Sequence, residues 1–273
     1  MIDNKISKLI IVQCRTGSTR LPGKILKDLG GKILLSVFME RIKKAKEPDG
    51  IVIATTNLPE DDIIIELCKK NNWLYFRGNT LDLLDRHYQC AKFFSADIVA
   101  KIPSDTPFND PELIDLVFKT YENGDFDYVS NLHPPTFPGG FDCEVFSFDA
   151  LEKSWKNARK DYEREHTTAY IWDNPEKFKI GNVTSKTNIN YSMKFRFQVD
   201  YEEDLEVAKR VFNTIYENNP NFSFYDLVEF LDKNKDIIAI NQQHIGINWY
   251  KNHLDELKNI KKSWTATNVR LIL

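Results

Sequence analysis

The first 125 residues contain short apolar runs that alternate with longer stretches in which apolar positions recur at helical spacing. The apolar runs have the length of buried strands and comprise residues 9–14, 51–56, 73–77 and 98–102. The stretches between them are predicted helices and comprise residues 33–45, 59–68, 81–94 and 111–121. Strands that alternate with helices in this way are typical of parallel βα units. The pattern therefore predicts an α/β protein with an open, mostly parallel, twisted sheet.

The pattern is less regular after residue 125, where we predict a mixed-sheet region around a Pro/Gly-rich loop at 134–140. Its predicted strands are residues 128–131, 144–148, 178–183 and 194–200. Its predicted helices are residues 162–172 and 202–216, and helical fragments follow at 224–231 and 249–260. We predict one main domain at 1–216, with halves at about 1–125 and 126–216. A helical accessory segment is predicted at 217–273.

Composition narrows the class of protein without identifying it. The 273 residues, 42% of them hydrophobic, can bury one sizeable core. The net charge of -3 excludes a general basic surface, so we expect no nucleic-acid partner. The four cysteines are scattered, which indicates a reducing compartment and argues against a zinc cluster. The first apolar run is far shorter than the ~18 residues of a membrane span, so we expect a cytoplasmic protein that does not contact a membrane.

The segment 13–24 directly follows the first predicted strand and combines three cations, two glycines and three hydroxyl side chains. Ligands of open α/β sheets bind beyond the carboxyl ends of the strands, where this segment must lie. Glycine lets backbone amides approach phosphate oxygens, and Arg15 and Lys24 supply charge where a leaving group becomes negative. We predict catalytic roles for Arg15 and Lys24. The residues predicted to bind a polyphosphate here are Gln13, Arg15, Gly17, Ser18 and Lys24.

Better-known phosphate-binding patterns do not fit this segment. Five residues separate Gly17 from Gly23, and Ile25 follows Lys24 where a Walker A loop has Ser or Thr. A dinucleotide-binding G-x-G-x-x-G pattern is absent from the segment as well. The alternative that remains is a solvated loop with chance basic residues.

Two aspartates follow predicted strands on the same side of the sheet. Asp105 lies just beyond residues 98–102, and Asp200 ends the predicted strand 194–200. Magnesium prefers one or two carboxylates together with water and substrate oxygens, so this pair is a candidate Mg²⁺ site. Each aspartate could instead cap a turn or the helix that follows it.

The segment QCRTGSTRLPGKIL at 13–26 resembles the opening motif of the spore-coat-polysaccharide-type cytidylyltransferases, relatives of CMP-Kdo synthetase and acylneuraminate cytidylyltransferase. Further similar segments are ATTNLPEDD at 54–62, FRGNTLDLLDRHYQCA at 76–91, DYVSN at 127–131, EVFSFDALEKSW at 144–155 and YEREHTTAYI at 162–171. Together these segments cover most of residues 8–210. The chain departs from the family pattern at Ser104, where a glycine is usual, which could tighten the backbone before Asp105.

The resemblance implies a nucleotidyltransferase or GT-A-like fold that uses CTP and Mg²⁺, with Asp105 and Asp200 as metal ligands. It also implies that Arg77, Asp82, Arg86 and Asp105 contact the nucleotide, and that two copies pair as a homodimer. The predicted reaction transfers CMP from CTP to a sugar, sugar-acid or related phosphorylated acceptor, with release of pyrophosphate, in surface polysaccharide biosynthesis. Polar groups on the mixed-sheet side are predicted to bind this sugar-like acceptor and comprise Asp142, Glu144, Glu165 and His166.

Two other classes of function stay open from the sequence. A GT-A-type glycosyltransferase would hold a nucleotide-sugar with a D-x-D motif, and Asp125-Phe126-Asp127 has that form. This tripeptide precedes the predicted strand 128–131, which puts it at the amino edge of the sheet, so a solvated turn explains it better. A non-catalytic nucleotide-binding protein is the third class, although no feature of the sequence favours it.

Overall fold

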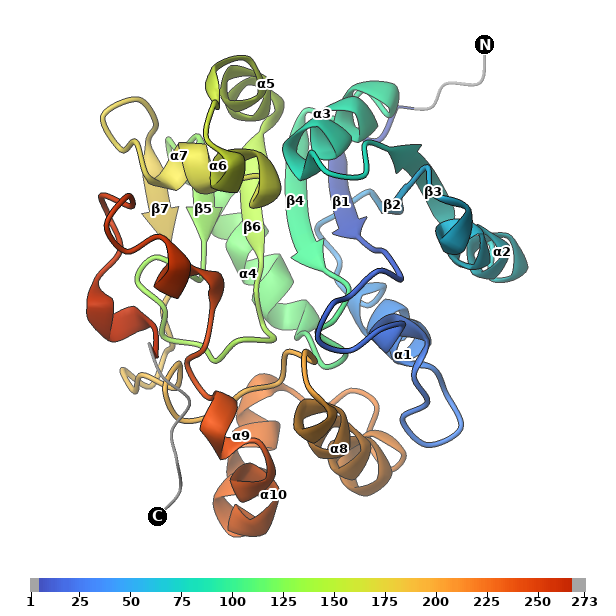
Figure 1. Cartoon of the computed structure of the whole chain (residues 1–273). Coiled ribbons are helices and arrows are strands. Elements are labelled where there is room, and N and C mark those ends of the chain that lie inside the picture. Colours follow the sequence, from blue (N-terminus) through green and yellow to red (C-terminus); the bar gives the residue numbers. More distant parts are fainter. Residues whose placement is uncertain (1–4, 267–273) are drawn as a thin grey trace.

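A seven-stranded sheet forms the centre of the computed structural model, which describes residues 5–266 (Figure 1). Its strands are β1 (Lys8–Gln13), β2 (Gly50–Thr56), β3 (Leu74–Gly78), β4 (Ile98–Pro103), β5 (Tyr128–Ser130), β6 (Glu144–Ser147) and β7 (Ile180–Asn182). Their order across the sheet is β3-β2-β1-β4-β6-β5-β7. Of these strands only β6 runs antiparallel to its neighbours, β4 and β5. The predicted mixed, mostly parallel α/β sheet is confirmed.

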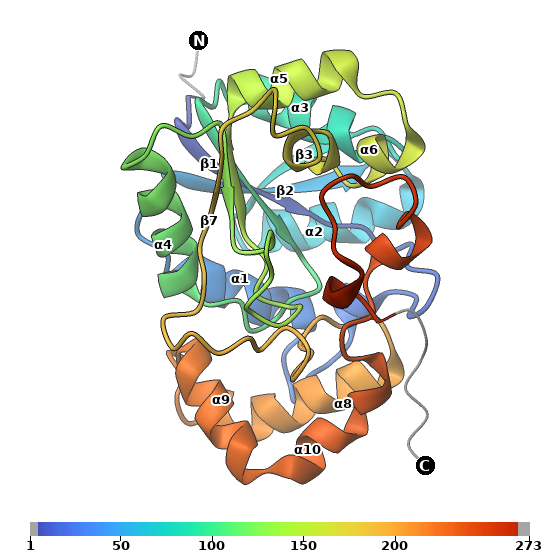
Figure 2. The same ribbon diagram turned by 90° about the vertical axis from the view of Figure 1, so that its left-hand side faces the viewer.

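Helices cover both faces of the sheet (Figure 2). They are α1 (Leu34–Ile42), α2 (Asp62–Lys70), α3 (Leu83–Phe93), α4 (Pro111–Glu122), α5 (Phe148–Asn157), α6 (Asp161–Glu165), α7 (Ala169–Trp172), α8 (Glu202–Val211), α9 (Phe224–Lys233) and α10 (Lys235–Ile240). Buried side chains of α1, α2 and α4 belong to one apolar cluster, and those of α3, α5, α6 and α7 belong to a second. Within the described residues, no helix is long and apolar enough to cross a membrane.

Alternation along β1 explains why both faces are covered. Ile10 and Val12 enter the cluster beneath α1, whereas Leu9 and Ile11 enter the cluster beneath α3. All four side chains are fully buried. A strand that is apolar on both faces must lie inside a sandwich of helices. The parallel strands β1, β2 and β4 therefore bring their carboxyl ends, and the loops that follow, to one edge of the sheet.

Three predicted elements differ in the structure. The predicted helix 162–172 is broken into α6 and α7, and Thr167 between them has a left-handed φ of 53°. The predicted strand 194–200 joins no strand of the sheet, because its amides bond to loops: Phe197 N–H donates to Gly139 O at 2.8 Å. The predicted helical fragment 249–260 was wrong, since this stretch contains only the 3₁₀ turn η5 (Trp249–Asn252) before irregular backbone.

The helices after residue 217 share the main core. Phe224 and Leu227 of α9 lie in the same buried cluster as Leu34 of α1. Residues 1–4 and 267–273, the ends of the two predicted segments, lie outside the described residues. The boundary at 217 stays a prediction.

Arg41 of α1 connects three parts of the chain from a fully buried position. Its guanidinium lies 4.2 Å from the centre of the Phe222 ring. It donates hydrogen bonds to the carbonyl oxygens of Phe108, Asn109, Pro220 and Phe222. Burial lowers the pKa of Arg41 to about 10, so the side chain still carries its charge at neutral pH.

We expect Arg41→Met to lower the free energy of unfolding by about 3 kcal/mol, because buried carbonyl oxygens lose their donor. Urea unfolding followed by circular dichroism measures this change. Arg210→Met is the matched control: Arg210 is exposed and pairs with Glu206 on its own helix, so the change should stay within about 0.5 kcal/mol. Equal effects of the two substitutions would contradict the assigned role.

Candidate nucleotide and acceptor site

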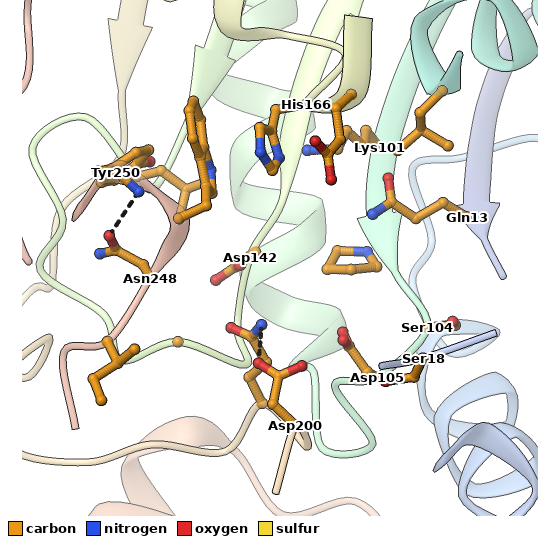
Figure 3. Close-up of a pocket in the computed structure, with 18 of the residues that line it drawn as sticks. Gln13, Ser18, Lys101, Ser104, Asp105, Asp142, His166, Asp200, Asn248 and Tyr250 are labelled. Carbon is orange, nitrogen blue, oxygen red and sulfur yellow. Dashed lines mark hydrogen bonds between the residues drawn. The ribbon is translucent and has the colours of Figure 1, made fainter. Parts of the chain in front are cut away.

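A cavity of about 780 Å³ opens at the carboxyl ends of β1 and β4 (Figure 3). Twelve of the fourteen predicted site residues line it, and the two that do not are Arg77 and Asp82. One half is formed by the loop after β1, the start of α3 and the turn after β4. The other half is formed by residues 132–144, by α6 and α7, and by the end of the described chain. The two halves meet at Asp105 and Asp200 (Figure 3).

The loop 13–24 is fixed by Asp61, in the turn after β2. Asp61 Oδ1 accepts hydrogen bonds from the Thr16 amide and the Thr16 hydroxyl, both at 2.7 Å. Thr56 donates to the other oxygen of the same carboxylate. Gly23 has a φ of 64°, a conformation that costs glycine little, and it directs the chain into a 3₁₀ turn that begins with Lys24. The loop is therefore a rigid feature of the site.

Lys24 joins the two aspartates. Its ammonium pairs with Asp105 Oδ2 and lies 2.8 Å from Asp200 Oδ1. Burial disfavours the charge of Lys24, but the two carboxylates outweigh burial and raise its pKa. Asp105 Oδ1 is buried and has no hydrogen-bond partner within residues 5–266. The arrangement is one cation held between two carboxylates, with one carboxylate oxygen left over.

Asp200 receives three further donors. Arg20 Nη2 lies 2.7 Å from Oδ1, while Arg196 Nη2 at 2.7 Å and Gln198 Nε2 at 2.9 Å contact Oδ2. Burial would raise the pKa of Asp200, but Lys24, Arg196 and Arg20 hold it well below its ordinary value. Asp200 is therefore ionised throughout the neutral range.

The half of the cavity next to the loop carries the remaining predicted nucleotide contacts. Arg15 is exposed on the loop, and Gln13 presents a buried side-chain oxygen with no partner among the described residues. Arg86 is 2% exposed and donates to the carbonyl oxygens of Asn79 and Thr80. Burial and the nearby charge of Arg15 lower the pKa of Arg86 to about 10. Arg86 therefore holds the loop before α3 in place through these hydrogen bonds, and it also lines the cavity.

Arg77 and Asp82 are not among the residues that line the cavity, and their predicted nucleotide contacts stay a prediction. Arg77 turns toward the β2 side, where it pairs with Asp62 at 2.6 Å and donates to the Thr56 carbonyl. Asp82 caps α3 by accepting from the Asp85 amide, and it pairs with Arg164. Both side chains are engaged in positioning neighbouring elements.

A buried ionic group forms the floor of the second half. Lys101 of β4 and Glu144 of β6 are paired residues of adjacent strands, and Lys101 Nζ lies 2.5 Å from Glu144 Oε1. Glu144 Oε2 accepts from Tyr128 at 2.7 Å and from Thr168 at 2.5 Å. Burial would raise the pKa of Glu144, but Lys101 and these donors lower it. Glu144 lines the cavity as predicted, with both oxygens already hydrogen-bonded.

Asp142, Glu165 and His166 also line this half. Asp142 points into the cavity (Figure 3), and burial together with the negative charges of Glu144 and Asp105 raises its pKa to about 7. The His166 ring stacks on Trp249 with centroids 3.7 Å apart. Burial and the charge of Lys101 lower the pKa of His166 to about 3, so its imidazole is neutral.

The far wall of the cavity is the C-terminal strap, which we define as residues 245–266. The strap closes on itself, since the Ala266 amide donates to Gly246 O at 2.8 Å. It is attached to Arg196, which donates to Ile247 O at 2.9 Å, and to Asp173, which accepts from the Lys258 amide. The residues of the strap that line the cavity include three large aromatic side chains, Trp249, Tyr250 and Trp264. Because the sequence pattern predicted a helical fragment at 249–260, these contacts of the strap were not anticipated.

Sequence reasoning assigned no role to Arg20, Lys101, Arg196 or Asp61. Arg20 is one of the three cations counted in the loop, so its position carried a signal. Arg196 and Gln198 alternate along the chain with three buried apolar residues, Phe195, Phe197 and Val199. This alternation places the two polar side chains on the side of the segment opposite to those apolar side chains. Lys101 and Asp61 depend on contacts between distant segments, which no local pattern reveals.

The D-x-D tripeptide lies outside the cavity. Asp125 is 89% exposed and pairs with Lys179, and Asp127 Oδ2 accepts from the Lys179 amide at 2.8 Å. Both aspartates precede β5 at the amino edge of the sheet, as the sequence predicted.

Comparisons with known proteins place this site in context. A family model described as Cytidylyltransferase matches residues 9–247. A protein of Methanocaldococcus jannaschii is 40% identical over 235 residues, which cover 85% of this chain and 93% of that protein. The spore coat polysaccharide biosynthesis protein SpsF of Bacillus subtilis is 31% identical over 233 residues, which cover 84% of this chain and 95% of that protein.

Solved structures agree with the fold. A cytidylyltransferase from Leptospira borgpetersenii superposes with a TM-score of 0.79 at 36% identity, covering 85% of this chain and 97% of that chain. A structure of CMP:2-keto-3-deoxy-manno-octonic acid synthetase complexed with CTP has a TM-score of 0.58 at 16% identity, covering 76% of this chain and 99% of that chain. At this lower identity the likeness concerns the fold alone.

His133 generates a pH prediction for stability. Its Nε2 lies 2.9 Å from the Tyr250 hydroxyl, its ring stacks on Trp172, and burial lowers its pKa to about 4 from an ordinary value of 6.5. The unfolded chain therefore binds a proton at higher pH than the folded chain does. Stability is full above pH 6.5 and falls as the pH drops toward 4.

We expect His133→Gln to make the free energy of unfolding less dependent on pH. The change in slope should be a fraction of about 1.4 kcal/mol per pH unit, which is the slope contributed by one proton that only the unfolded chain binds. Urea midpoints measured between pH 7.5 and pH 4.5 give the slope. A wild-type slope identical to that of His133→Gln would refute the assignment.

Proposed function

Because the chain belongs to the cytidylyltransferase family, we propose that it transfers CMP from CTP to a sugar, sugar-acid or related phosphorylated acceptor. Pyrophosphate is released in this reaction, and the product serves surface polysaccharide biosynthesis. The support for a polysaccharide role is the name of the relative SpsF.

One observation carries the proposal: Lys24, Asp105 and Asp200 converge at the carboxyl ends of the strands, beside a rigid loop. Such a centre matches the needs of nucleotidyl transfer, which depends on positioning and on stabilising charge. An acceptor oxygen attacks the α-phosphorus of CTP, the new P–O bond forms, and the bond to pyrophosphate breaks. Lys24 and Arg15 bind the phosphates and stabilise the negative charge of the leaving pyrophosphate.

The residues present fit a magnesium ion. Asp105 and Asp200 already share one cation, and Asp105 retains a buried oxygen without a partner among the described residues. No cluster of three or more His, Cys, Asp or Glu side chains suited to a metal occurs within residues 5–266, and magnesium uses one or two carboxylates together with phosphate oxygens. Held by Asp105 and Asp200, magnesium would withdraw negative charge from the phosphate oxygens.

The acceptor occupies the half of the cavity that contains Asp142 and the C-terminal strap. Trp249, Tyr250 and Trp264 offer flat apolar surfaces, against which a sugar ring packs. The Asp142 carboxyl has a pKa of about 7, so at neutral pH it can accept the proton of an attacking hydroxyl. Glu144 acts indirectly, by holding Lys101 and Tyr128 in place.

We expect Asp105→Asn and Asp200→Asn each to lower kcat/KM by at least about 100-fold. Each substitution removes a carboxylate that would hold magnesium next to the phosphates. Release of pyrophosphate from CTP and magnesium, with a panel of a sugar acid, a sugar phosphate and a polyol phosphate, measures the activity. Asp125→Asn is the matched control and should retain wild-type activity, since Asp125 is exposed at the opposite edge of the sheet.

A second assay, in which a nucleotide-sugar replaces CTP as the donor, separates the rival class. A glycosyltransferase would release UMP or UDP from a nucleotide-sugar without pyrophosphate, and Asp125→Asn would impair it. Thermal shifts with CTP, UTP, GTP and ATP in magnesium identify the base, because only a ligand that binds the native state raises Tm. A preference for a base other than cytosine would overturn the assignment of CTP.

A further inference from the structure

The ammonium of Lys24 lies between the carboxylates of Asp105 and Asp200 and contacts both. We propose that Lys24 acts as a stand-in cation, which keeps divalent metal out of the site until a nucleotide triphosphate draws its ammonium away. Metal then enters only together with the nucleotide. This inference rests on the proposed assignment of the two aspartates as metal ligands.

Backbone and side-chain hydrogen bonds both fix the positions of the two aspartates. The Val199 amide donates to Asp105 O at 2.9 Å, so the turn after β4 and the segment that ends in Asp200 are joined directly. The Asp200 side chain is 4% exposed and is fixed by Arg196 and Gln198. The distance between the carboxylates is therefore set by the fold, and the space between them holds the Lys24 ammonium.

The charges of the centre already balance. Asp105 and Asp200 carry two negative charges, and Lys24 and Arg20 supply two positive charges at contact distance. Arg196 is offset by Asp204, which it contacts at 3.1 Å. A divalent ion arriving alone would meet a neutral centre in which Asp105 Oδ2 and both oxygens of Asp200 are already paired, so that only Asp105 Oδ1 has no partner within the described residues, and the ion would be repelled by the cations beside it.

A triphosphate changes this balance. It brings several negative charges to the loop that also carries Arg15 and Ser18, and Lys24 lies at the end of that loop. The lysine ammonium sits on a flexible four-carbon stem, so it can turn from the carboxylates to a phosphate without movement of the backbone. The carboxylate oxygens that it leaves are then available to the metal, whose remaining ligands are the phosphates.

Manganese binding in the absence of nucleotide tests the proposal, because Mn²⁺ shares the oxygen ligands of Mg²⁺ and its free form gives a paramagnetic resonance signal. We expect little binding of Mn²⁺ at this pair in the wild type. Lys24→Met, which keeps the length of the side chain and removes the charge, should tighten Mn²⁺ binding by at least about tenfold. The gain should disappear in Lys24→Met combined with Asp105→Asn.

Two further variants make the result specific. Lys27→Met removes a nearby lysine that pairs with exposed Glu202, at 3.8 Å, and it should leave Mn²⁺ binding at the wild-type level. Lys24→Arg retains a positive charge and should continue to exclude Mn²⁺. Should Lys24→Met prove unfolded by circular dichroism, Lys24→Gln carries the same expectation.

Wild-type binding as tight as that of Lys24→Met, or a folded neutral variant that gains no affinity, would overturn the proposal. These measurements contain the metal alone, so their outcome does not depend on whether CTP is the substrate. A gain in Mn²⁺ affinity without any CTP-dependent pyrophosphate release would contradict the proposed function but would still support the role of Lys24 as a stand-in cation.

Discussion

The carboxylate of Asp200 is the point on which the site depends. Lys24, Arg20, Arg196 and Gln198 all donate to it, and they come from the loop after β1 and from the segment that precedes α8. A buried carboxylate is stable only when its charge is matched and its oxygens are hydrogen-bonded. The hydrogen bonds and ion pairs that stabilise Asp200 therefore require these distant parts of the chain to lie next to one another. The same group of contacts reaches Asp105 through Lys24 and the C-terminal strap through Arg196.

The parts of the fold that could be predicted from sequence are those encoded locally. Strands β1 to β4 are short, mainly apolar runs, and the helices between them have one apolar face, so period and length identify them. The loop 13–24 could be singled out because its functional groups are contiguous. Asp105 and Asp200 were recognisable because each follows an extended segment, and the structure brings them together around Lys24.

The parts that could not be predicted depend on partners far away in the sequence. Arg77 and Asp82 lie near the site in the chain, yet Asp62 and Arg164 draw them into structural pairs. The alternation at 195–199 is genuine, but the amides bond to Gly139 and Asp105 rather than to a strand. Residues 249–260 have helix-compatible spacing, but their aromatic side chains pack against His133, Tyr162 and His166 instead. In each case tertiary contacts override local preference.

The position of the C-terminal strap in the chain has a consequence for how such enzymes diversify. The family model ends at residue 247, whereas Trp249, Tyr250 and Trp264 line the cavity beyond that point. These aromatic residues form part of the cavity wall but supply none of the groups that pair with Asp105 or Asp200. A contiguous C-terminal segment can thus change during evolution without altering the ion pairs of Asp105 and Asp200. The shape of this cavity wall can then vary while the sheet and the loop after β1 stay as they are.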